Sequence, residues 1–482
     1  MTPAQTNLVD TLRQRFGPKV VTTDAEDIAP WLTDWRGRYR GAAPALLSPG
    51  STEEVAAIVA LAAAAGVPIV PQGGNTGMVG GATPPIDGSA LLLSTRRMNR
   101  IRSMLPQSNL AVAEAGVILS NLHAAAGEVG RRFPLSLGAK GSATIGGLVS
   151  TNAGGVQVLR FGTMRSLVAG VEAVLPDGSV HDGLVPLKKD NRGYDLTQLL
   201  IGAEGTLGIV TAATLRLYPA IVQRAAAWVG VESPHRALEL LRMLEAQTDT
   251  IESFEVIPAE TLGHVLAHVP GTRSPLDGAH AWHVLIESVA TDPAAEAPGA
   301  LLERLLMPAF EAGLAEDAVI SASEAQVEAF WNLRDSISGA ERALGPAMQH
   351  DISVPVDDMP RFLIEGAAAT ERAFPGTHAS GFGHLGDGNV HFHVRAPDGA
   401  DAESWYAGEG HAISSFVYDM VVAAGGSISA EHGIGQMKRD ELERLSAPSR
   451  IAALRAIKGA FDPHNILNPG KLVSLAPGPR TP

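Results

Sequence analysis

Residues 71–81 read PQGGNTGMVGG and directly follow the apolar run VPIV at 67–70. Glycines at this density let backbone amides approach a bound group without obstruction from a Cβ atom, and consecutive amides can form a nest for an anion. An ordinary surface loop is the plain alternative for such a stretch taken alone. Its place after a strand-like run makes it a candidate phosphate loop.

Three further glycine-dense segments occur in the first half of the chain. They are SLGAKGSATIGG at 136–147, STNAGG at 150–155 and GAEGTLGIV at 202–210. Four such segments in one domain are expected to serve a large cofactor that lies against backbone. None of them has the strand, G-x-G-x-x-G and helix order of a nicotinamide site, or the GxxxxGK[ST] pattern of a P-loop.

The composition indicates a globular protein with more than one domain. The chain has 482 residues, too many for a single core, and 45% of them are hydrophobic and 18% charged. A formal net charge of −14 disfavours nucleic acid and anionic membranes as general partners. The absence of cysteine excludes disulfides, thiolate metal sites, iron–sulfur clusters and cysteine-linked cofactors.

The sequence shows no targeting signal and no membrane-spanning run. Its first residues, MTPAQTNLVDTLRQRFG, lack the basic and then apolar order of a secretory signal and are typical of an amphipathic helix. No apolar run reaches the ~20 residues that span a bilayer. We therefore expect a cytoplasmic protein.

The order of expected elements changes near residues 219–224. Before this boundary, alternating strands and helices predict one α/β or α+β domain, with a capped helix that begins at Ser51 or Thr52. After it, the order predicts an antiparallel sheet with helices on one face. The strands are expected at 67–70, 90–94, 109–113, 169–175, 208–217, 225–231, 251–256 and 282–288, and the later helices at 119–127, 234–247, 299–313 and 323–344.

A second stretch, GFGHLGDGNVHFH at 381–393, has two readings. Its first six residues match the G-x-G-x-x-G fingerprint of dinucleotide sites, but that fingerprint must open a helix. Here Asp387-Gly388 is a hairpin signal followed by the alternating strand NVHFHV, so the match is accidental. The three histidines beside the turn then favour a metal site, with surface or capped core histidines as the plain alternative.

The hairpin predicts which histidines converge. A two-residue turn at the Asp-Gly pair places His384 opposite His391 on one face, with Cβ atoms ~5 Å apart. His393 shares that face. Downstream, Glu431 and His432 are neighbours, so that one can bind a metal while the other reaches elsewhere. A nitrogen and oxygen ligand set permits Zn²⁺ and leaves Mn²⁺, Co²⁺ and Fe²⁺ open.

The segments PQGGNTGMVGG, SLGAKGSATIGGLVSTNAGG and IGAEGTLGIVT resemble the flavin-binding segments of the vanillyl-alcohol-oxidase/p-cresol-methylhydroxylase superfamily. Within it they are most similar to the branch of D-2-hydroxyacid dehydrogenases that includes D-2-hydroxyglutarate and D-lactate dehydrogenases, and the resemblance covers nearly the whole chain. It implies an α+β fold, in which a two-part FAD-binding domain of the p-cresol-methylhydroxylase (PCMH) type precedes an FAD-linked-oxidase C-terminal domain with an antiparallel sheet covered by helices. The implied parts are an N-terminal helical segment at 1–38, the FAD-binding domain at 39–219, a substrate or cap domain with the metal hairpin at 220–425, and a C-terminal segment returning to the flavin at 426–482.

The resemblance implies non-covalent FAD, because the pyrophosphate loop lacks the histidine that covalent members often use. The first glycine segment would hold the pyrophosphate, and the others would line the flavin and the adenosine end. The implied cofactor contacts are Pro71, Gly73, Gly74, Asn75, Thr76, Gly77, Ser136, Gly138, Ser142, Gly146, Asn152, Gly155, Gly205 and Ile209.

The resemblance also implies a metal centre and a base. His384, His391 and Glu431 match the metal ligands of zinc-dependent members, and His432 matches their catalytic histidine. The implied reaction oxidises a D-2-hydroxyacid to the 2-oxoacid. In it the metal lowers the pKa of the C2 hydroxyl, His432 takes its proton, and the C2 hydride passes to flavin N5.

The residues implied to contact the substrate are Arg334, Ser338, Gln349, His393 and Asn468. Arg334 suits a carboxylate because its planar fork binds one bidentately. Taken alone, the same arginine would be read as a surface ion pair on a helix.

Two positions depart from the 2-hydroxyglutarate branch, which typically has lysine where this chain has Gln349 and asparagine where it has His393. The lost cation favours monocarboxylic substrates such as D-lactate, with D-2-hydroxyglutarate as the alternative. A mononuclear zinc hydrolase and a flavin- or nucleotide-binding module without turnover are rivals of other classes. The sequence leaves open the electron acceptor, the metal and the oligomeric state, with a homodimer among the options.

Overall fold

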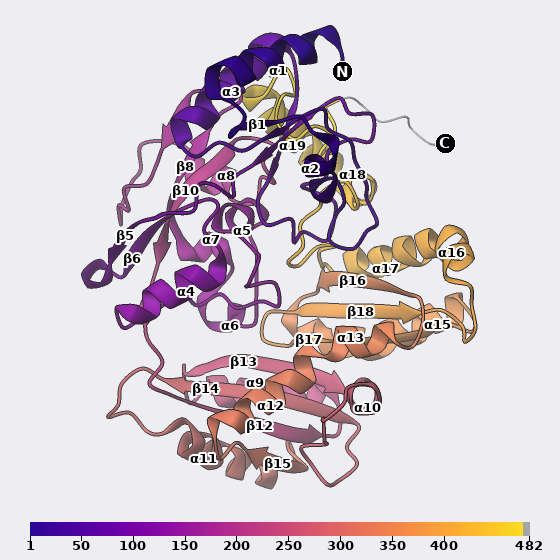
Figure 1. The fold of residues 1–482 in the computed structure, drawn as a ribbon. Coiled ribbons are helices and arrows are strands. Elements are labelled where there is room, and N and C mark those ends of the chain that lie inside the picture. The colour runs from indigo at the N-terminus through magenta and orange to yellow at the C-terminus, as the bar shows by residue number, and fades with distance from the viewer. Residues whose placement is uncertain (476–482) are drawn as a thin grey trace. The chain divides into compact units, whose positions relative to one another are not determined.

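The computed structural model of the chain describes residues 1–475 and contains two compact units (Figure 1). Unit 1 comprises Met1–Gly155, Gly162–Pro219 and the segment from Glu431 onward, and unit 2 comprises Val156–Phe161 and Ala220–Ala430. The chain therefore passes from unit 1 into unit 2 twice and returns to unit 1 each time, so each unit joins residues that are far apart in the sequence.

The strands of unit 1 form two larger sheets and one short pair within the described residues. The first sheet has the order β1-β2-β4-β3, in which β2, β4 and β3 run parallel. The second is antiparallel with the order β5-β6-β10-β8-β9, and β7 pairs with β11. The strands are β1 (Val21–Thr22), β2 (Leu46–Leu47), β3 (Ile69–Gln72), β4 (Leu91–Ser94), β5 (Ile101–Leu105), β6 (Leu110–Glu114), β7 (Arg131–Arg132), β8 (Val168–Val174), β9 (Val180–Asp182), β10 (Ile209–Arg216) and β11 (Tyr218–Pro219).

Helix α3 shows how local sequence defines the helices of unit 1. The Ser51 side chain accepts a hydrogen bond from the Glu54 N–H at the start, and Gly66 ends the helix in the left-handed region with φ 63°. The predicted start at Ser51 or Thr52 is therefore confirmed. The helices are α1 (Pro3–Phe16), α2 (Ala25–Ile28), α3 (Thr52–Ala65), α4 (Leu119–Glu128), α5 (Ile145–Thr151), α7 (Met164–Leu167), α8 (Leu196–Leu200), α18 (Arg439–Leu445) and α19 (Pro448–Phe461).

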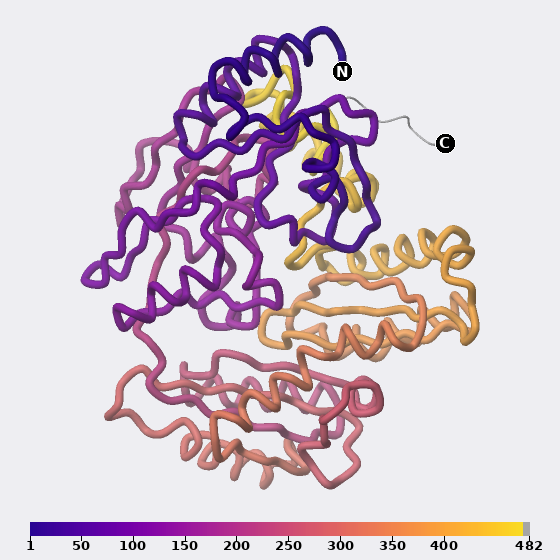
Figure 2. Tube along the Cα trace, viewed as in Figure 1, coloured from indigo at the N-terminus to yellow at the C-terminus, as the bar shows by residue number. Residues whose placement is uncertain are grey.

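The C-terminal segment packs into unit 1 beside the strand that precedes the first glycine loop. The Ile69 N–H donates to the Ile466 carbonyl at 2.8 Å, and Ile69 forms a parallel bridge with Leu467. Both residues belong to the same apolar core as Leu91 and Val55. Figure 2 shows the yellow C-terminal trace running among the indigo and purple segments of this unit. The end of the chain thus supports β3 where the glycine loop begins.

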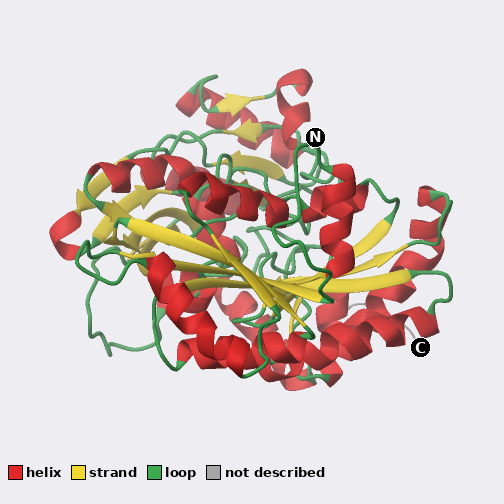
Figure 3. Ribbon diagram, turned by 90° about the horizontal axis from the view of Figure 1, so that it is seen from below, coloured by secondary structure: helices red, strands yellow, loops and turns green. Residues whose placement is uncertain are grey.

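Unit 2 is built on one antiparallel sheet with the strand order β15-β12-β14-β13-β17-β18-β16. Figure 3 shows its long strands crossing one another with the usual twist. The strands are β12 (Gln223–Val231), β13 (Ile251–Pro258), β14 (Trp282–Ala290), β15 (Asp317–Ile320), β16 (Ala347–Ser353), β17 (His378–His384) and β18 (Asn389–Arg395). The helices are α6 (Val158–Phe161), α9 (Pro234–Glu245), α10 (Ala259–His268), α11 (Pro298–Glu311), α12 (Glu324–Asp335), α13 (Ile337–Arg342), α14 (Met359–Arg361), α15 (Ala367–Ala373), α16 (Ala402–Trp405) and α17 (His411–Ala423).

The predicted antiparallel sheet covered by helices is confirmed, but helices cover both of its faces rather than one. Ala226 and Trp228 of β12 pack with Phe330 of α12. Ala225 points to the other face, where its Cβ faces Gly299 of α11. The physical reason is visible in β12, whose residues 225–231 are buried without alternation. A strand that is apolar on both sides must be covered on both sides.

The helix predicted at 323–344 is interrupted. Helix α12 ends at Asp335 and α13 begins at Ile337, with Ser336 between them. The break places Arg334 in the last turn of α12 and Ser338 in a separate helix. Within the described part of the chain, no helix has both the length and the apolar character needed to cross a bilayer.

Candidate functional site

The first two glycine segments lie against each other in unit 1. A Cβ atom on Gly74 would be 2.0 Å from the Ser142 carbonyl oxygen, and one on Gly73 would be 2.3 Å from Thr144 Oγ1. Asn75 has a φ of 54° and donates a hydrogen bond from Nδ2 to the Thr33 carbonyl at 2.9 Å. A side chain at Gly74 would push the backbone of the two loops apart, whereas one at Gly73 would require the Thr144 side chain to move.

The other glycine segments join the same region. A Cβ on Gly155 would be 2.3 Å from the Ser136 carbonyl oxygen, and one on Gly205 would be 2.5 Å from Pro71 Cγ. The four segments that the sequence singles out are therefore neighbours in one unit. Gly77 and Gly138 are different, because a Cβ at either position would meet no heavy atom within 4 Å.

Three of the predicted cofactor residues make contacts within unit 1 itself. The Asn152 Oδ1 accepts hydrogen bonds from Thr163 Oγ1 and the Arg165 N–H, both at 2.9 Å, and so holds the turn before α7. Ile209 is part of the apolar core. A Cβ on Gly146 would be 2.6 Å from the Cβ of Ala115. At these positions the structure shows a packing or hydrogen-bonding role within unit 1.

One buried polar atom of this region without a hydrogen-bond partner among the described residues is Gln72 Oε1, at the start of the first loop. Two more are Thr144 Oγ1, at the junction of the first two loops, and Asn468 Oδ1. The Asn468 Nδ2 is satisfied, because it donates to the carbonyls of Gly81 at 3.0 Å and Glu204 at 2.7 Å. Native proteins rarely leave such atoms unsatisfied. The glycine approach and these atoms together fit a large polar cofactor.

The histidine strands of unit 2 differ from the predicted hairpin. His384 pairs with Asn389 across the turn, and His391 pairs with Phe382, so the predicted pairing of His384 with His391 is wrong. The loop spans 385–388 instead of the Asp-Gly pair alone, because the Asp387 and Gly388 N–H groups both bond the His384 carbonyl. The added loop residues change the register by two.

His384 and His391 nevertheless share one face of the sheet. A shift of two residues keeps side chains on the same side, and the two become diagonal neighbours. Their ring centroids are 5.4 Å apart, with ring planes at 77°, and ligand nitrogens on the two rings lie within 4.8 Å of each other. Two imidazoles at this separation can bind one ion.

His393 lies further along the same face and has another partner. Its Nδ1 forms a hydrogen bond with the Glu341 carboxylate from α13, and its ring contacts that of Phe382 edge-on with centroids 5.3 Å apart. Gln349 of β16 is its cross-strand neighbour. Ser338, also on α13, is exposed. The buried carboxylate of Glu341 therefore lies beside the predicted substrate residue His393, whose cross-strand neighbour is Gln349.

A buried ion cluster joins Arg334 to the histidine pair through Glu255 of β13. The Arg334 Nε donates to one carboxylate oxygen of Glu255 at 2.8 Å, and His384 Nδ1 lies 2.5 Å from the other. The Arg334 Nη2 is 3.3 Å from His384 Nε2, and its Cζ is 5.7 Å from the Phe382 ring centroid. The side chain of Glu255 is 1% exposed. The cluster combines α12, β13 and β17.

Glu255 is the residue that sequence reasoning missed. Its signal is the run IESFEVIP at 251–258, in which two acidic residues interrupt an otherwise apolar strand. A buried carboxylate needs a positive or hydrogen-bonding partner. The partner comes from α12, which follows β13 by more than sixty residues, so the pattern shows that a partner exists without showing which one.

The charges of the cluster stabilise one another. Burial would raise the pKa of Glu255, but Arg334 and His384 hold it well below its usual range. Burial would lower the pKa of His384, but the charge of Glu255 and its hydrogen bond raise it to about 9. Burial, Arg334 and His384 lower the pKa of His391. Glu255 thus stabilises the protonated form of His384, while the neutral form of His391 is favoured.

Glu431 and His432 begin the segment that returns the chain to unit 1. They follow Ala430, the last residue of the unit that carries the histidine strands. Ser427, four residues before Glu431, bonds Ser353 of β16 through both backbone groups, at 2.8 and 3.0 Å. The chain that leads to Glu431 is therefore anchored at the edge strand of the histidine sheet.

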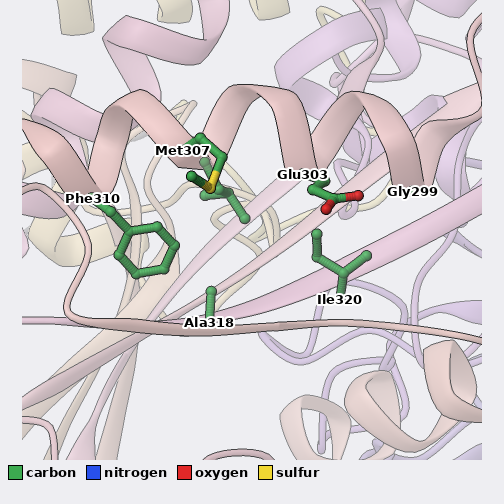
Figure 4. Close-up of a pocket in the computed structure, with 7 residues that line it drawn as sticks. Gly299, Glu303, Met307, Phe310, Ala318 and Ile320 are labelled. Carbon is green, nitrogen blue, oxygen red and sulfur yellow. The ribbon is translucent and has the colours of Figure 1, made fainter.

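A separate groove in unit 2 lies between α11 and β15 (Figure 4). The labelled side chains around it are Glu303, Met307, Phe310, Ala318 and Ile320, together with Gly299. They are mostly apolar and include none of the predicted site residues. The groove is therefore distinct from the residues of the candidate site.

Comparison with known families covers most of the chain. Residues 43–183 match the model of the FAD binding domain, and residues 222–472 match that of the C-terminal domain of FAD linked oxidases. Both halves of the fold that the sequence predicts are thus recognised independently. The FAD-binding match contains the first three glycine segments, and the oxidase match includes the histidine sheet.

Several named proteins are similar to this chain over most of their length. The mitochondrial D-2-hydroxyglutarate dehydrogenase of Bos taurus is 37% identical over 463 residues, which cover 95% of this chain and 82% of that protein. The D-2-hydroxyglutarate dehydrogenase of Xanthomonas citri pv. viticola is 36% identical over 468 residues, 97% of each chain. A putative mitochondrial D-lactate dehydrogenase of Schizosaccharomyces pombe is 33% identical over 464 residues, 94% of this chain and 86% of that one.

Solved structures share the fold at low identity. p-Cresol methylhydroxylase with bound substrate matches with a TM-score of 0.76 at 16% identity, over 99% of this chain and 98% of that chain. The 4-ethylphenol oxidase of Gulosibacter chungangensis matches with a TM-score of 0.72 at 19% identity, over 98% of each. The predicted PCMH-type fold is confirmed. The chain belongs to the FAD-linked oxidases, in the family that includes the D-2-hydroxyglutarate dehydrogenases.

Proposed function

We propose that this protein oxidises a D-2-hydroxyacid to the 2-oxoacid with FAD and a divalent metal. The observation that carries the proposal is the pair of His384 and His391 on one sheet face, with ligand nitrogens within 4.8 Å and a buried carboxylate behind one ring. Family membership excludes the rival hydrolase, because the glycine loops belong to an FAD-binding domain.

The cofactor residues are the glycine loops of unit 1. Gly73, Gly74, Asn75 and Thr76 would hold the pyrophosphate through backbone amides, and Thr144 Oγ1 and Asn468 Oδ1 would gain the hydrogen bonds that they lack. The absence of histidine at 71–81 supports non-covalent binding. FAD, when bound, supplies the acceptor for the hydride that leaves C2 of the substrate.

The metal residues would be His384, His391 and Glu431. Glu255 holds Nδ1 of His384, so the Nε2 atom is the one that faces a metal, as in other carboxylate–histidine pairs. Because Arg334 Nη2 is 3.3 Å from that Nε2, the guanidinium must turn away when a metal binds. The freed donors of Arg334 can then bind a substrate carboxylate. A divalent metal would supply Lewis acidity toward the substrate hydroxyl.

His432 would accept the proton of the substrate hydroxyl. Its neighbour Glu431 is the proposed third ligand, and the chain bends at both residues. Their side-chain ligand atoms lie within 4.8 Å of each other, so a base at His432 would stand beside the metal ligand Glu431. Arg334 would orient the carboxylate and so align C2 for transfer.

The substrate would be a monocarboxylic D-2-hydroxyacid such as D-lactate. Gln349 offers no positive charge, and its neighbour His393 is bonded to the buried Glu341, so this part of the site disfavours a second carboxylate. D-2-hydroxyglutarate is the second candidate, because the relatives at 36–37% identity are D-2-hydroxyglutarate dehydrogenases. The electron acceptor would be a separate small molecule or protein.

The central test is anaerobic bleaching of the flavin absorbance by a panel of D-2-hydroxyacids. We expect bleaching by D-lactate and longer monocarboxylic acids, with higher efficiency than by D-2-hydroxyglutarate or D-malate. Absence of flavin absorbance from protein purified with FAD would refute the cofactor assignment. Flavin that no acid on the panel reduces would refute the dehydrogenase assignment.

The site is tested by two sets of variants. His384→Ala and His391→Ala should each lose the metal while retaining FAD, and full metal occupancy in both would rule out these ligands. His432→Ala should slow flavin reduction by about 10²–10⁴-fold, the usual contribution of a positioned base. A rate within a few-fold of the unmodified protein would place the base elsewhere.

A further inference from the structure

The proposed chemistry makes no use of Glu204, although this acid is buried in unit 1. Glu204 is 8% exposed and lies in the fourth glycine segment with a φ of 52°, a conformation that residues other than glycine seldom adopt. Its Oε1 accepts the Ile434 N–H and its Oε2 accepts the Gly435 N–H, both at 2.7 Å. The two bonded residues follow His432 closely.

A carboxylate suits this position better than a neutral side chain. When ionised it only accepts hydrogen bonds, and here each oxygen faces a backbone N–H. Glutamine of the same shape would turn an NH₂ group toward one of these donors. Burial raises the pKa of Glu204, while the two backbone bonds and the charges of Lys438 and Lys471 lower it.

The segment after His432 is held on its other side by the first glycine loop. The Val79 carbonyl accepts hydrogen bonds from the N–H groups of Gln436 at 3.1 Å and Met437 at 3.2 Å. A Cβ on Gly435 would be 2.3 Å from the same Val79 oxygen. The segment therefore lies between Glu204 and the loop that would hold the pyrophosphate.

Glu204 is itself fixed to the cofactor region. Its N–H donates to the Ser150 carbonyl at 2.8 Å, and its carbonyl accepts from Asn468 Nδ2 at 2.7 Å. The same Asn468 nitrogen bonds the Gly81 carbonyl at 3.0 Å. The backbone of Glu204 thus follows the glycine loops, while its side chain holds the segment that carries His432.

We propose that Glu204 is a positioning residue that sets the place of His432 relative to the flavin-binding loops. This inference rests on the proposed role of His432 as the base. Glu204 would act only through His432, by fixing the backbone two and three residues downstream. Without the carboxylate the segment would keep its bonds to Val79 but lose those that Glu204 accepts from Ile434 and Gly435.

The first experiment compares flavin-reduction rates in a double-mutant cycle. Glu204→Gln should retain stoichiometric FAD and slow reduction about 10–100-fold, since a displacement of ~1 Å can cost 10²-fold. In the His432→Ala background the same change should have almost no further effect, because the residue through which it acts is gone. Glu204→Asp, which keeps the charge, should recover part of the rate.

A matched control is Glu172→Gln, the same change at another buried carboxylate of unit 1. Glu172 bonds Thr52 Oγ1 at 2.6 Å and Thr211 Oγ1 at 2.7 Å, away from the His432 segment. This variant should reduce flavin within a few-fold of the unmodified rate. A rate loss equal to that of Glu204→Gln would assign both effects to general stability and overturn the inference.

The second experiment needs no turnover. Hydrogen exchange of the peptide that contains 431–438 should be faster in Glu204→Gln than in the unmodified protein and in Glu172→Gln, because two amide acceptors are weakened. Unchanged exchange would overturn the inference. If Glu204→Gln slowed flavin reduction by its full factor even in the His432→Ala background, Glu204 would act independently of His432 and the inference would be overturned. Loss of FAD from both Glu204→Gln and Glu204→Asp would also overturn it, because Glu204 would then serve cofactor binding. A near-normal rate in His432→Ala would instead refute the proposed base.

Discussion

The glycine loops of unit 1 and the histidine sheet of unit 2 are both candidate binding regions, and they are built in opposite ways. The loops approach each other because side chains are missing, as where Gly74 meets the Ser142 carbonyl. The sheet carries long charged side chains that meet in a buried cluster, as where Glu255 joins Arg334 to His384. Backbone atoms form the first region and ionised groups form the second.

The two regions should therefore fail under different substitutions. A region made by backbone contact tolerates no added Cβ, whatever its polarity. A buried ion cluster tolerates changes of shape better than loss of one charge, because the remaining partner is left buried without compensation.

The largest effect is expected from Gly74→Ala. The added Cβ would lie 2.0 Å from the Ser142 oxygen, so the two loops must separate and FAD should bind at least about 100-fold more weakly, ~3 kcal/mol. Flavin content and fluorescence titration with FAD measure this. Gly127→Ala on α4 is the control, because its Cβ would meet no heavy atom within 4 Å. Stoichiometric FAD in Gly74→Ala would show that the loops do not form the cradle.

Glu255→Gln should weaken metal binding while leaving FAD in place. The variant keeps the shape but loses the charge that orients Nδ1 of His384, and such changes typically cost 10–100-fold in metal affinity. Titration with Zn²⁺ after removal of bound metal gives the value. Glu287→Gln makes the same change on β14, where the carboxylate bonds Trp331 instead. Equal losses in both variants would argue against an orienting role for Glu255.

Gln349→Lys should shift the substrate preference toward dicarboxylates. The new cation would stand beside His393 and Glu341, and an ion-assisted hydrogen bond is worth ~1–2 kcal/mol more than a neutral one. The ratio of kcat/KM for D-2-hydroxyglutarate to that for D-lactate should rise by about 5–30-fold. Gln247→Lys adds the same charge on an exposed position and should leave the ratio unchanged. No shift in Gln349→Lys would remove this residue from the substrate site.

The smallest effect concerns acid stability of unit 2. Burial and the charge of His280 lower the pKa of His283 to about 4, and Trp228 Nε1 donates to its Nδ1 at 3.2 Å. Because the unfolded chain takes up this proton near pH 6.5 and the folded chain only near 4, the free energy of unfolding falls as pH drops through that window.

His283→Asn offers an oxygen to Trp228 but cannot titrate, so it should remove that part of the pH dependence. Between pH 7.5 and 5.5, the free energy of unfolding of the unmodified protein should fall by about 1 kcal/mol more than that of the variant. Urea unfolding followed by Trp fluorescence measures it. An identical pH slope for both proteins would show that His283 titrates normally in the folded state.

The histidine hairpin shows where local pattern stops being sufficient. The Asp387-Gly388 signal correctly predicts a turn between two strands, but the register depends on which backbone groups close the loop. The observed shift of two residues preserves the face of every side chain, so the prediction that His384 and His391 share a face holds although their direct pairing does not. A shift of one would have separated them.

What the sequence determined by itself is carried by local signals. Glycine density marked the four loops that are proposed to hold FAD, because the close approach of these loops depends on the absence of a Cβ. Residue periodicity, caps and turns predicted strands such as β12, β13 and β14 and helices such as α3, α4 and α9, since these depend on neighbours a few positions away, but they did not predict β16, α17 or α19. Only the tertiary structure showed that Glu255 holds His384 and Arg334, that Glu341 holds His393, and that Glu204 holds the segment after His432. Each of these contacts joins elements that are distant in the chain. An acidic residue in an apolar segment indicates that a partner is needed, but the sequence alone does not identify that partner.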